Sequence, residues 1–136
     1  MDFEGNRYTI VSEEAISSEN NRNIVQMKGV LATFYFKDNT ILNVSSDSGD
    51  YNNVNLDMIF RGNVKASYEN SELFAGFAKF SSSENLLKIS DNVKVIDKRG
   101  TMLADKLTFD IKSKTLNITS LKNKMIKSNI KYKWKK

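Results

Sequence analysis

The sequence predicts a single all-β domain spanning residues 1–136, and three observations carry this prediction. Apolar and polar residues alternate with a period of two along most of the chain, whereas helical periodicity is hard to find. Groups of turn-forming residues separate the alternating stretches at short intervals. The chain contains no proline, so long ladders of backbone hydrogen bonds can form without interruption. Its length suits one domain with its own core.

The alternation is clearest in residues 56–68, 87–95, 107–112 and 130–135. Apolar side chains occupy one parity in each stretch, and charged or small polar side chains occupy the other. Ile59 is the exception. A strand with this pattern has one apolar face and one solvated face. We therefore expect these strands to pack one side against a shared core.

Turn-forming residues separate the predicted strands at Lys37–Asn39, Glu69–Asn70, Ser81–Asn85 and Asp97–Gly100. Asn, Asp, Ser and Gly favour turns because they tolerate unusual backbone angles or bond to nearby backbone. The spacing predicts consecutive antiparallel hairpins. An aromatic run, Phe34–Phe36, precedes the first turn and puts bulk on both faces of its strand. It fits either a rim of the fold or a hairpin end.

The predicted strands also repeat. Asn63-Val64-Lys65 recurs 29 positions later as Asn92-Val93-Lys94, and the same shift relates Phe60 to Ile89. A shift of 34 relates Gly29-Val30 to Asn63-Val64. The chain therefore contains about three units of two or three strands each. A unit of this size cannot bury its apolar face alone, so neighbouring units must stack into one structure.

Gly62-Asn63 and the equivalent Asp91-Asn92 are residue types that tolerate positive φ. The apolar parity continues from Phe60 to Val64. We therefore expect the strand to bend there without exchanging its faces, although an ordinary two-residue turn would fit a single copy equally well. A bend of this kind helps a sheet to fold over on itself.

The composition excludes several kinds of chemistry. The chain has no cysteine, which rules out disulfides and thiolate metal sites, and no histidine, the commonest general base and metal ligand. Catalysis by Ser-His-Asp or Cys-His groups is therefore impossible. A carboxylate pair or a Ser-Lys pair is still available, but among so many charged residues either would be unremarkable by chance. We expect no enzyme, no catalytic residue, no metal and no cofactor.

The net charge of +5 is unevenly distributed. Residues 1–111 have a net charge of −4, whereas residues 112–136 contain nine lysines and no acid. The basic end could face phosphates or an acidic partner, or it could be a solvated terminus. No nucleic-acid-binding motif accompanies it, so we expect no nucleic-acid partner.

No stretch approaches the roughly 18 consecutive apolar residues of a membrane helix. Residues 1–8 lack the basic and apolar regions of a secretory signal. The sequence is therefore consistent with a cytosolic protein or with a form whose targeting segment is absent.

An ordered series of residues resembles the repeat of the LptA/LptC/OstA group, roughly over residues 3–119. The series is Leu56-x-Met58-x-Phe60-x-Gly62-Asn63-Val64, Leu73-x-Ala75, Ile89-x-x-Asn92-Val93 and Met102-x-Ala104-Asp105-x-Leu107. Upstream residues are more similar to LptC than to LptA: Gly5-x-x-Tyr8, Ser12 to Ala15, and Ser46-x-x-Gly49-x-Tyr51.

The resemblance implies an open β-jellyroll of two facing antiparallel sheets. It implies a periplasmic domain that receives lipopolysaccharide, through its lipid A, from an inner-membrane ABC transporter and passes it to a periplasmic LptA-like bridge protein. The full-length protein would carry an N-terminal inner-membrane anchor, which this chain lacks. Two alternatives stay open: a soluble LptA-type bridge component, and a structural β-repeat or interaction module without lipid cargo.

The apolar parity supplies the candidate lining of a lipid-binding trough, although the same residues could be ordinary core. These residues are Phe60, Val64, Leu73, Leu87, Ile89, Val93, Val95, Leu107, Phe109 and Ile111. The last stretch supplies a candidate partner edge at Ile130, Tyr132 and Trp134, which alternate with lysines. Those lysines could instead prevent unwanted strand pairing.

Overall fold

The computed structural model describes the backbone of residues 2–3, 6–121 and 130–133 and the side chains of residues 7–118. In this part of the chain every regular element is a strand, which confirms the all-β prediction. The strands are β1 (Asp2–Phe3), β2 (Asn6–Ser17), β3 (Ile24–Tyr35), β4 (Ile41–Asn52), β5 (Met58–Tyr68), β6 (Ser71–Ser81), β7 (Leu86–Asp97), β8 (Gly100–Asp110), β9 (Thr115–Leu121) and β10 (Ile130–Lys133). The residues described include no helix that could cross a membrane.

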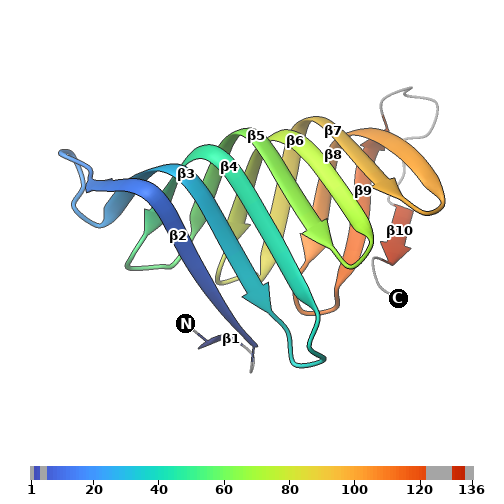
Figure 1. Cartoon of the computed structure of the whole chain (residues 1–136), viewed down its shortest axis with the longest axis horizontal. Helices are drawn as coiled ribbons and strands as arrows, with labels where there is room; N and C mark the ends of the chain where they lie inside the picture. Colours follow the sequence, from blue (N-terminus) through green and yellow to red (C-terminus); the bar gives the residue numbers. More distant parts are fainter. Residues whose placement is uncertain (1, 4–5, 122–129, 134–136) are drawn as a thin grey trace.

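The strands form one ten-stranded antiparallel sheet in chain order (Figure 1). This arrangement follows from the short turns between them, since a tight turn can join only antiparallel neighbours. The predicted turns at Lys37–Asn39, Glu69–Asn70, Ser81–Asn85 and Asp97–Gly100 all connect neighbouring strands in this way. The prediction of consecutive hairpins is therefore confirmed.

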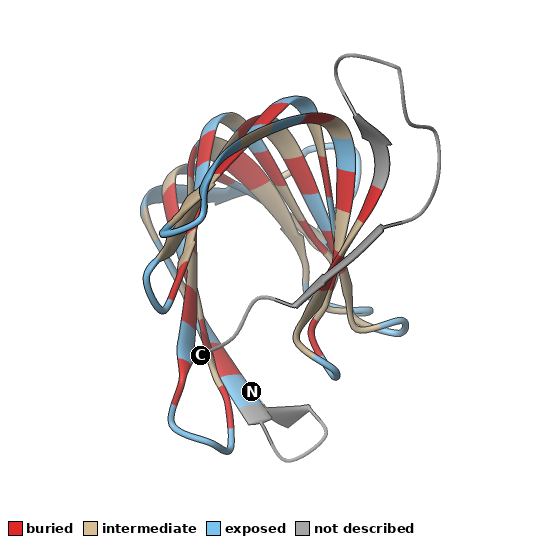
Figure 2. Ribbon diagram, turned by 90° about the vertical axis from the view of Figure 1, so that its right-hand side faces the viewer, coloured by how far each residue is buried: buried red, intermediate tan, exposed pale blue. Residues whose placement is uncertain are grey.

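The sheet bends near the middle of its long strands and folds into an arch (Figure 2). Gly62 and Asn63 have φ of 81° and 46°, and Asp91 and Asn92 have φ of 74° and 55°. Gly29 on β3 has φ of 64°. The pairing register shifts along the same line, at residues 45–48, 61–64, 74–77, 90–93 and 104–107. The bend predicted at the repeated Asn positions is confirmed.

Because each long strand crosses the bend, it contributes to two facing walls. The front wall, nearer the viewer in Figure 1, ends at the β3–β4, β5–β6 and β7–β8 turns. The back wall ends at the β2–β3, β4–β5, β6–β7 and β8–β9 turns. The two facing sheets expected from the sequence are thus two halves of one continuous sheet, and the fold is an open β-jellyroll.

At the bend, glycine leaves room for carboxylate side chains of the neighbouring strand. A Cβ on Gly76 would lie 2.1 Å from Asp91 Oδ2, and one on Gly62 would lie 3.1 Å from Asp47 Oδ2. Asn63 Nδ2 donates a hydrogen bond of 2.8 Å to Asp47 Oδ2. Carboxylates on β4 and β7 therefore occupy the space that a side chain would take on the neighbouring strand.

One detail of the predicted pattern is wrong. Leu56, expected on the apolar face of a strand, lies in the β4–β5 turn with φ of 69°, and β5 begins at Met58. The Asn52 side chain accepts hydrogen bonds from the amides of Val54 and Asn55, which forms the turn instead. Local bonding from an Asn side chain therefore outweighs the alternation at this position.

Candidate functional site: the interior between the two walls

The ten residues predicted to line a trough all lie on the inner face of the arch. Each is at most 2 % exposed, and all belong to one hydrophobic cluster. Val64, Leu73, Val93 and Val95 come from the front wall. The back wall contributes the other six, namely Phe60, Leu87, Ile89, Leu107, Phe109 and Ile111. The structure thus brings the predicted residues together between the walls.

Aromatic rings connect the two walls in two groups, and of these rings Phe109 alone was among the predicted site residues. In the first group, Phe34 of the front wall meets Phe80 of the back wall, with ring centroids 5.2 Å apart. Tyr8 of the front wall lies 6.2 Å from Phe80. In the second group, Tyr68 of the front wall lies 6.1 Å from Phe109 of the back wall. The walls therefore touch, and the interior is packed where these rings meet.

The alternation along the chain could indicate which of these aromatic side chains point inward. Phe34 and Phe36 share the parity that points inward on β3 and its turn, and both are buried. Tyr35 lies between them on the opposite parity and is half-buried. Periodicity could assign their faces. It could not identify Phe80 as the partner of Phe34, because that contact joins β3 and β6, which are not neighbours in the sheet.

An ion pair also joins the walls at their rim. The Lys114 ammonium, in the β8–β9 turn of the back wall, donates to the Asp38 carboxylate in the β3–β4 turn of the front wall. We call this contact the rim pair. Thr40 Oγ1 donates to Asp38 Oδ1 at 2.5 Å. The bonds from Lys114 and then Thr40 hold the pKa of Asp38 well below its ordinary value.

The rim pair lies against the aromatic interior. Lys114 Nζ is 5.2 Å from the centroid of the Phe36 ring, and Phe36 packs edge-on against Tyr68 at 6.0 Å. The Tyr68 hydroxyl donates to Thr40 Oγ1 at 3.2 Å, and burial raises the pKa of Tyr68. The polar rim and the apolar interior are therefore parts of one connected set of contacts.

Few polar groups interrupt the interior. Among residues 7–118, the buried polar side chains are Thr40 and Ser46. Thr40 bonds Asp38 and Tyr68, and Ser46 Oγ donates to the Ser48 carbonyl at 2.9 Å. Their hydrogen-bonding needs are met, so little polar penalty opposes an apolar occupant between the walls.

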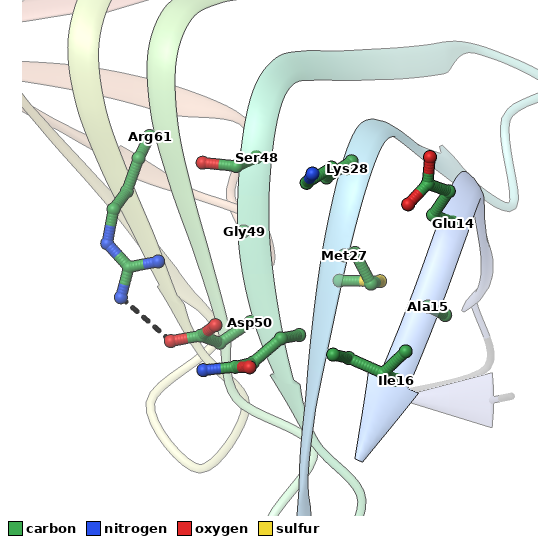
Figure 3. Close-up of a pocket in the computed structure, with 10 residues that line it drawn as sticks. Glu14, Ala15, Ile16, Met27, Lys28, Ser48, Gly49, Asp50 and Arg61 are labelled. Carbon is green, nitrogen blue, oxygen red and sulfur yellow. Dashed lines mark hydrogen bonds and ion pairs between the residues drawn. The ribbon is translucent and has the colours of Figure 1, made fainter. Parts of the chain in front are cut away.

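The outer side of the back wall carries a separate hollow of about 310 Å³ between β2 and β5 (Figure 3). Glu14, Lys28 and Arg61 lie along it, and Arg61 bonds Asp50 at 2.7 Å. Its lining combines charged side chains of both signs with the apolar side chains of Ala15, Ile16 and Met27, unlike the interior.

The predicted partner edge falls partly outside the described residues. Ile130 and Tyr132 lie on β10, where their backbones pair with Ile118 and Leu116 of β9. Trp134 lies outside the described part of the chain. At the other end of the sheet, β1 pairs only with Asn6 and Arg7 of β2.

A folded-over antiparallel sheet with an apolar interior and a polar rim defines a class of open β-jellyroll proteins. Residues 1–124 match the family described as "Lipopolysaccharide-assembly, LptC-related". The chain belongs to this family, whose members are periplasmic components of lipopolysaccharide transport and not enzymes. No sequence among the curated proteins matches it significantly.

A solved structure supports the fold. The chain is similar to LptH from Pseudomonas aeruginosa, described as the LptA homologous periplasmic component of the conserved lipopolysaccharide transport device. The TM-score is 0.65 at 10% sequence identity, and the alignment covers 93% of this chain and 94% of LptH. At this identity the similarity establishes the shared β-jellyroll.

Proposed function

We propose that this chain holds the acyl chains of lipopolysaccharide between its two walls during transport. It would receive the lipid from an inner-membrane ABC transporter and pass it to a periplasmic bridge protein of the LptA type. The observation that carries this proposal is the shared interior, where ten buried apolar residues from both walls form one cluster.

The energetics suit a carrier. Each CH₂ group buried between the walls contributes about 0.8 kcal/mol. An occupant must first displace the contacts between the walls, and each aromatic pair is worth about 0.5–1.5 kcal/mol beyond its buried area. The free energy gained by burying the acyl chains must first offset the loss of these contacts between the walls. The net affinity for the cargo is therefore moderate, which permits transfer to the next protein.

Charge introduced into the interior tests the lipid site. Ile89→Glu places a carboxylate between the walls, whereas Lys88→Glu places one on the outer face of the same strand. We expect the first variant to lose lipid A binding at least about tenfold because a buried carboxylate lacks a partner. The second should bind like the parent. Native mass spectrometry measures binding.

Circular dichroism must show that the Ile89→Glu variant is folded, since core substitutions can unfold a protein. Ile89→Asn, which is uncharged, is a milder second variant. Folded interior variants that bind lipid A as well as Lys88→Glu would overturn the proposed lipid site.

We assign the partners to the ends of the sheet. Val11 and Ile16 on β2 are 59% and 65% exposed, beyond the part of β2 that β1 pairs with. Exposed apolar groups on a strand near a sheet edge suit addition of another strand. The transporter would bind at this end, beside the N-terminal anchor of the full-length protein, and the bridge protein would bind beyond β10.

Deleting residues 121–136 tests the second assignment. The truncated chain should keep lipid binding and lose the bridge protein in a pull-down. Retained partner binding with increased self-association would instead identify the C-terminal lysines as residues that prevent unwanted pairing.

The LptA-type alternative predicts a different outcome. The alignment with LptH over nearly its whole length favours this second candidate. A soluble bridge component would bind a further bridge domain at both ends of its sheet. Pull-downs that use either the transporter or the bridge protein as the only bait distinguish the LptC-type function from the LptA-type alternative.

A further inference from the structure

A cavity of about 430 Å³ lies at the rim of the front wall. Its lining comes from β2, the end of β3 and the β3–β4 turn, and it includes Arg7, Tyr35, Phe36, Lys37, Asn39 and Thr40. The cavity adjoins the interior through Phe36, which is 5% exposed and packs against Tyr68.

The charges around this cavity favour an anion. Arg7 and Lys37 contribute two cations, and none of the described residues that line the cavity is acidic. Asp38 belongs to the same turn, yet its carboxylate is engaged by Lys114 and Thr40. The Asp38 carboxylate is therefore already engaged by a cation of the protein itself.

Arg7 is already positioned to receive a ligand. Its guanidinium carbon lies 5.0 Å from the centroid of the Tyr35 ring. This cation–π contact places the guanidinium over the ring, and the guanidinium carries five N–H donors in one plane. A guanidinium presents a fork of donors that matches two oxygens of a phosphate.

The turn that forms the cavity floor is held by its own bonds. The Phe36 amide donates to the Thr40 carbonyl and the Asn39 amide to the Phe36 carbonyl, both at 3.0 Å. Asn39 has φ of 70°, which Asn tolerates better than most residues. A fixed turn lowers the entropy lost when a ligand binds.

We infer that Arg7 and Lys37 bind a phosphate monoester carried on the sugar headgroup of the lipid cargo. This inference rests on the proposed function: acyl chains between the walls would leave the headgroup at the rim, beside this cavity. The site adds a preference for phosphorylated lipid to an interior that recognises only apolar chains.

A soluble sugar phosphate tests the site without the acyl chains. Glucosamine 1-phosphate, and not glucosamine, should shift the backbone amide NMR signals of Arg7 and residues 36–41. Replacing both cations in Arg7→Gln/Lys37→Gln should weaken this binding about fivefold or more, because two charge-assisted contacts are lost. A control, Arg22→Gln/Lys98→Gln, removes the same charges from two other exposed turn positions and should bind like the parent.

Lipids test the connection to transport. The parent should bind phosphorylated lipid A more tightly than its dephosphorylated form, and Arg7→Gln/Lys37→Gln should lose this preference. Equal binding of both lipids by the parent, or equal losses in the control variant, would overturn the site. Inorganic phosphate that shifts the same amides, without any lipid preference, would indicate a free-phosphate site and also overturn it. Failure of the parent to bind either lipid, with the sugar phosphate shifts intact, would refute the proposed function alone.

Discussion

Gly49 on β4 lies against the backbone of the neighbouring strand. A Cβ at this position would lie 2.2 Å from the Ile59 carbonyl oxygen of β5. This glycine has no positive φ, so close approach alone requires it. The obstacle is backbone and cannot rotate away as a side-chain end could.

We predict that Gly49→Ala destabilises the fold by about 1–3 kcal/mol, since the added methyl must push β4 and β5 apart. Ser45→Ala on the same strand, with its side chain on the outer face, should stay within about 0.5 kcal/mol of the parent. Urea unfolding followed by circular dichroism measures both. Equal stabilities for the two variants would show that β4 and β5 adjust freely at this contact.

The sequence could predict some of these special positions and not others. Gly62-Asn63 and Asp91-Asn92 were predicted to bend because their residue types tolerate positive φ, and both do so. Gly49 gave no such signal. The atom that requires glycine there belongs to β5, and its position depends on the pairing register of two strands.

The repeating unit of this sheet is a hairpin of two strands. The shift of 29 residues moves Asn63 on β5 to Asn92 on β7, two strands along and in the same direction. Both residues then lie on the same line of bending. The repeat found in the sequence therefore corresponds to one hairpin that crosses both walls twice. Periodicity could predict this because each unit pairs only with its neighbours.

On the outer face of the back wall, one pair of facing charged residues has the same sign and another pair has opposite signs. Lys79 on β6 lies directly opposite Lys88 on β7, so two like charges face each other. Lys88 is partly compensated by Glu84, 3.7 Å away. Near the other end of the wall, Lys28 on β3 lies opposite Glu14 on β2 (Figure 3).

We predict that a Lys→Glu substitution changes the stability of the protein in opposite directions at Lys79 and at Lys28. Lys79→Glu should stabilise the protein by about 0.2–1 kcal/mol, because it places opposite charges across the strands. Lys28→Glu should destabilise it by a similar amount, because it faces Glu14. Thermal unfolding at low and high salt measures the difference, which should shrink as salt screens the charges. Shifts of the same sign in both variants would contradict the prediction.

Contacts between the walls are the part of the molecule that the sequence could not predict. A period of two indicates which face of a strand is apolar, and all ten predicted interior residues are indeed buried. It does not indicate which strands face each other across the fold. Asp38 and Lys114 are 76 residues apart in two different turns. From the sequence, Lys114 was only one of nine lysines in the basic C-terminal end.

The rim pair leads to a prediction about the whole molecule. Lipid between the walls requires them to separate, because aromatic contacts join them in this structure. The chain has no cysteine, so Asp38→Cys/Lys114→Cys introduces the only two thiols. Joining them with a short thiol-reactive crosslinker should slow lipid A uptake about tenfold or more, since the rims are then held together. Uptake before crosslinking should be at least as fast as in the parent, because the ion pair is absent.

A matched crosslink within one wall distinguishes closure from general stiffening. The Ser82 amide donates to Asp57 Oδ1 at 2.9 Å, which joins two neighbouring turns of the back wall. Asp57→Cys/Ser82→Cys with the same crosslinker should leave uptake unchanged, because the walls can still separate. Equal slowing by both crosslinks would point to loss of motion within a wall, and no slowing by either would mean that lipid enters without separation at the rim pair.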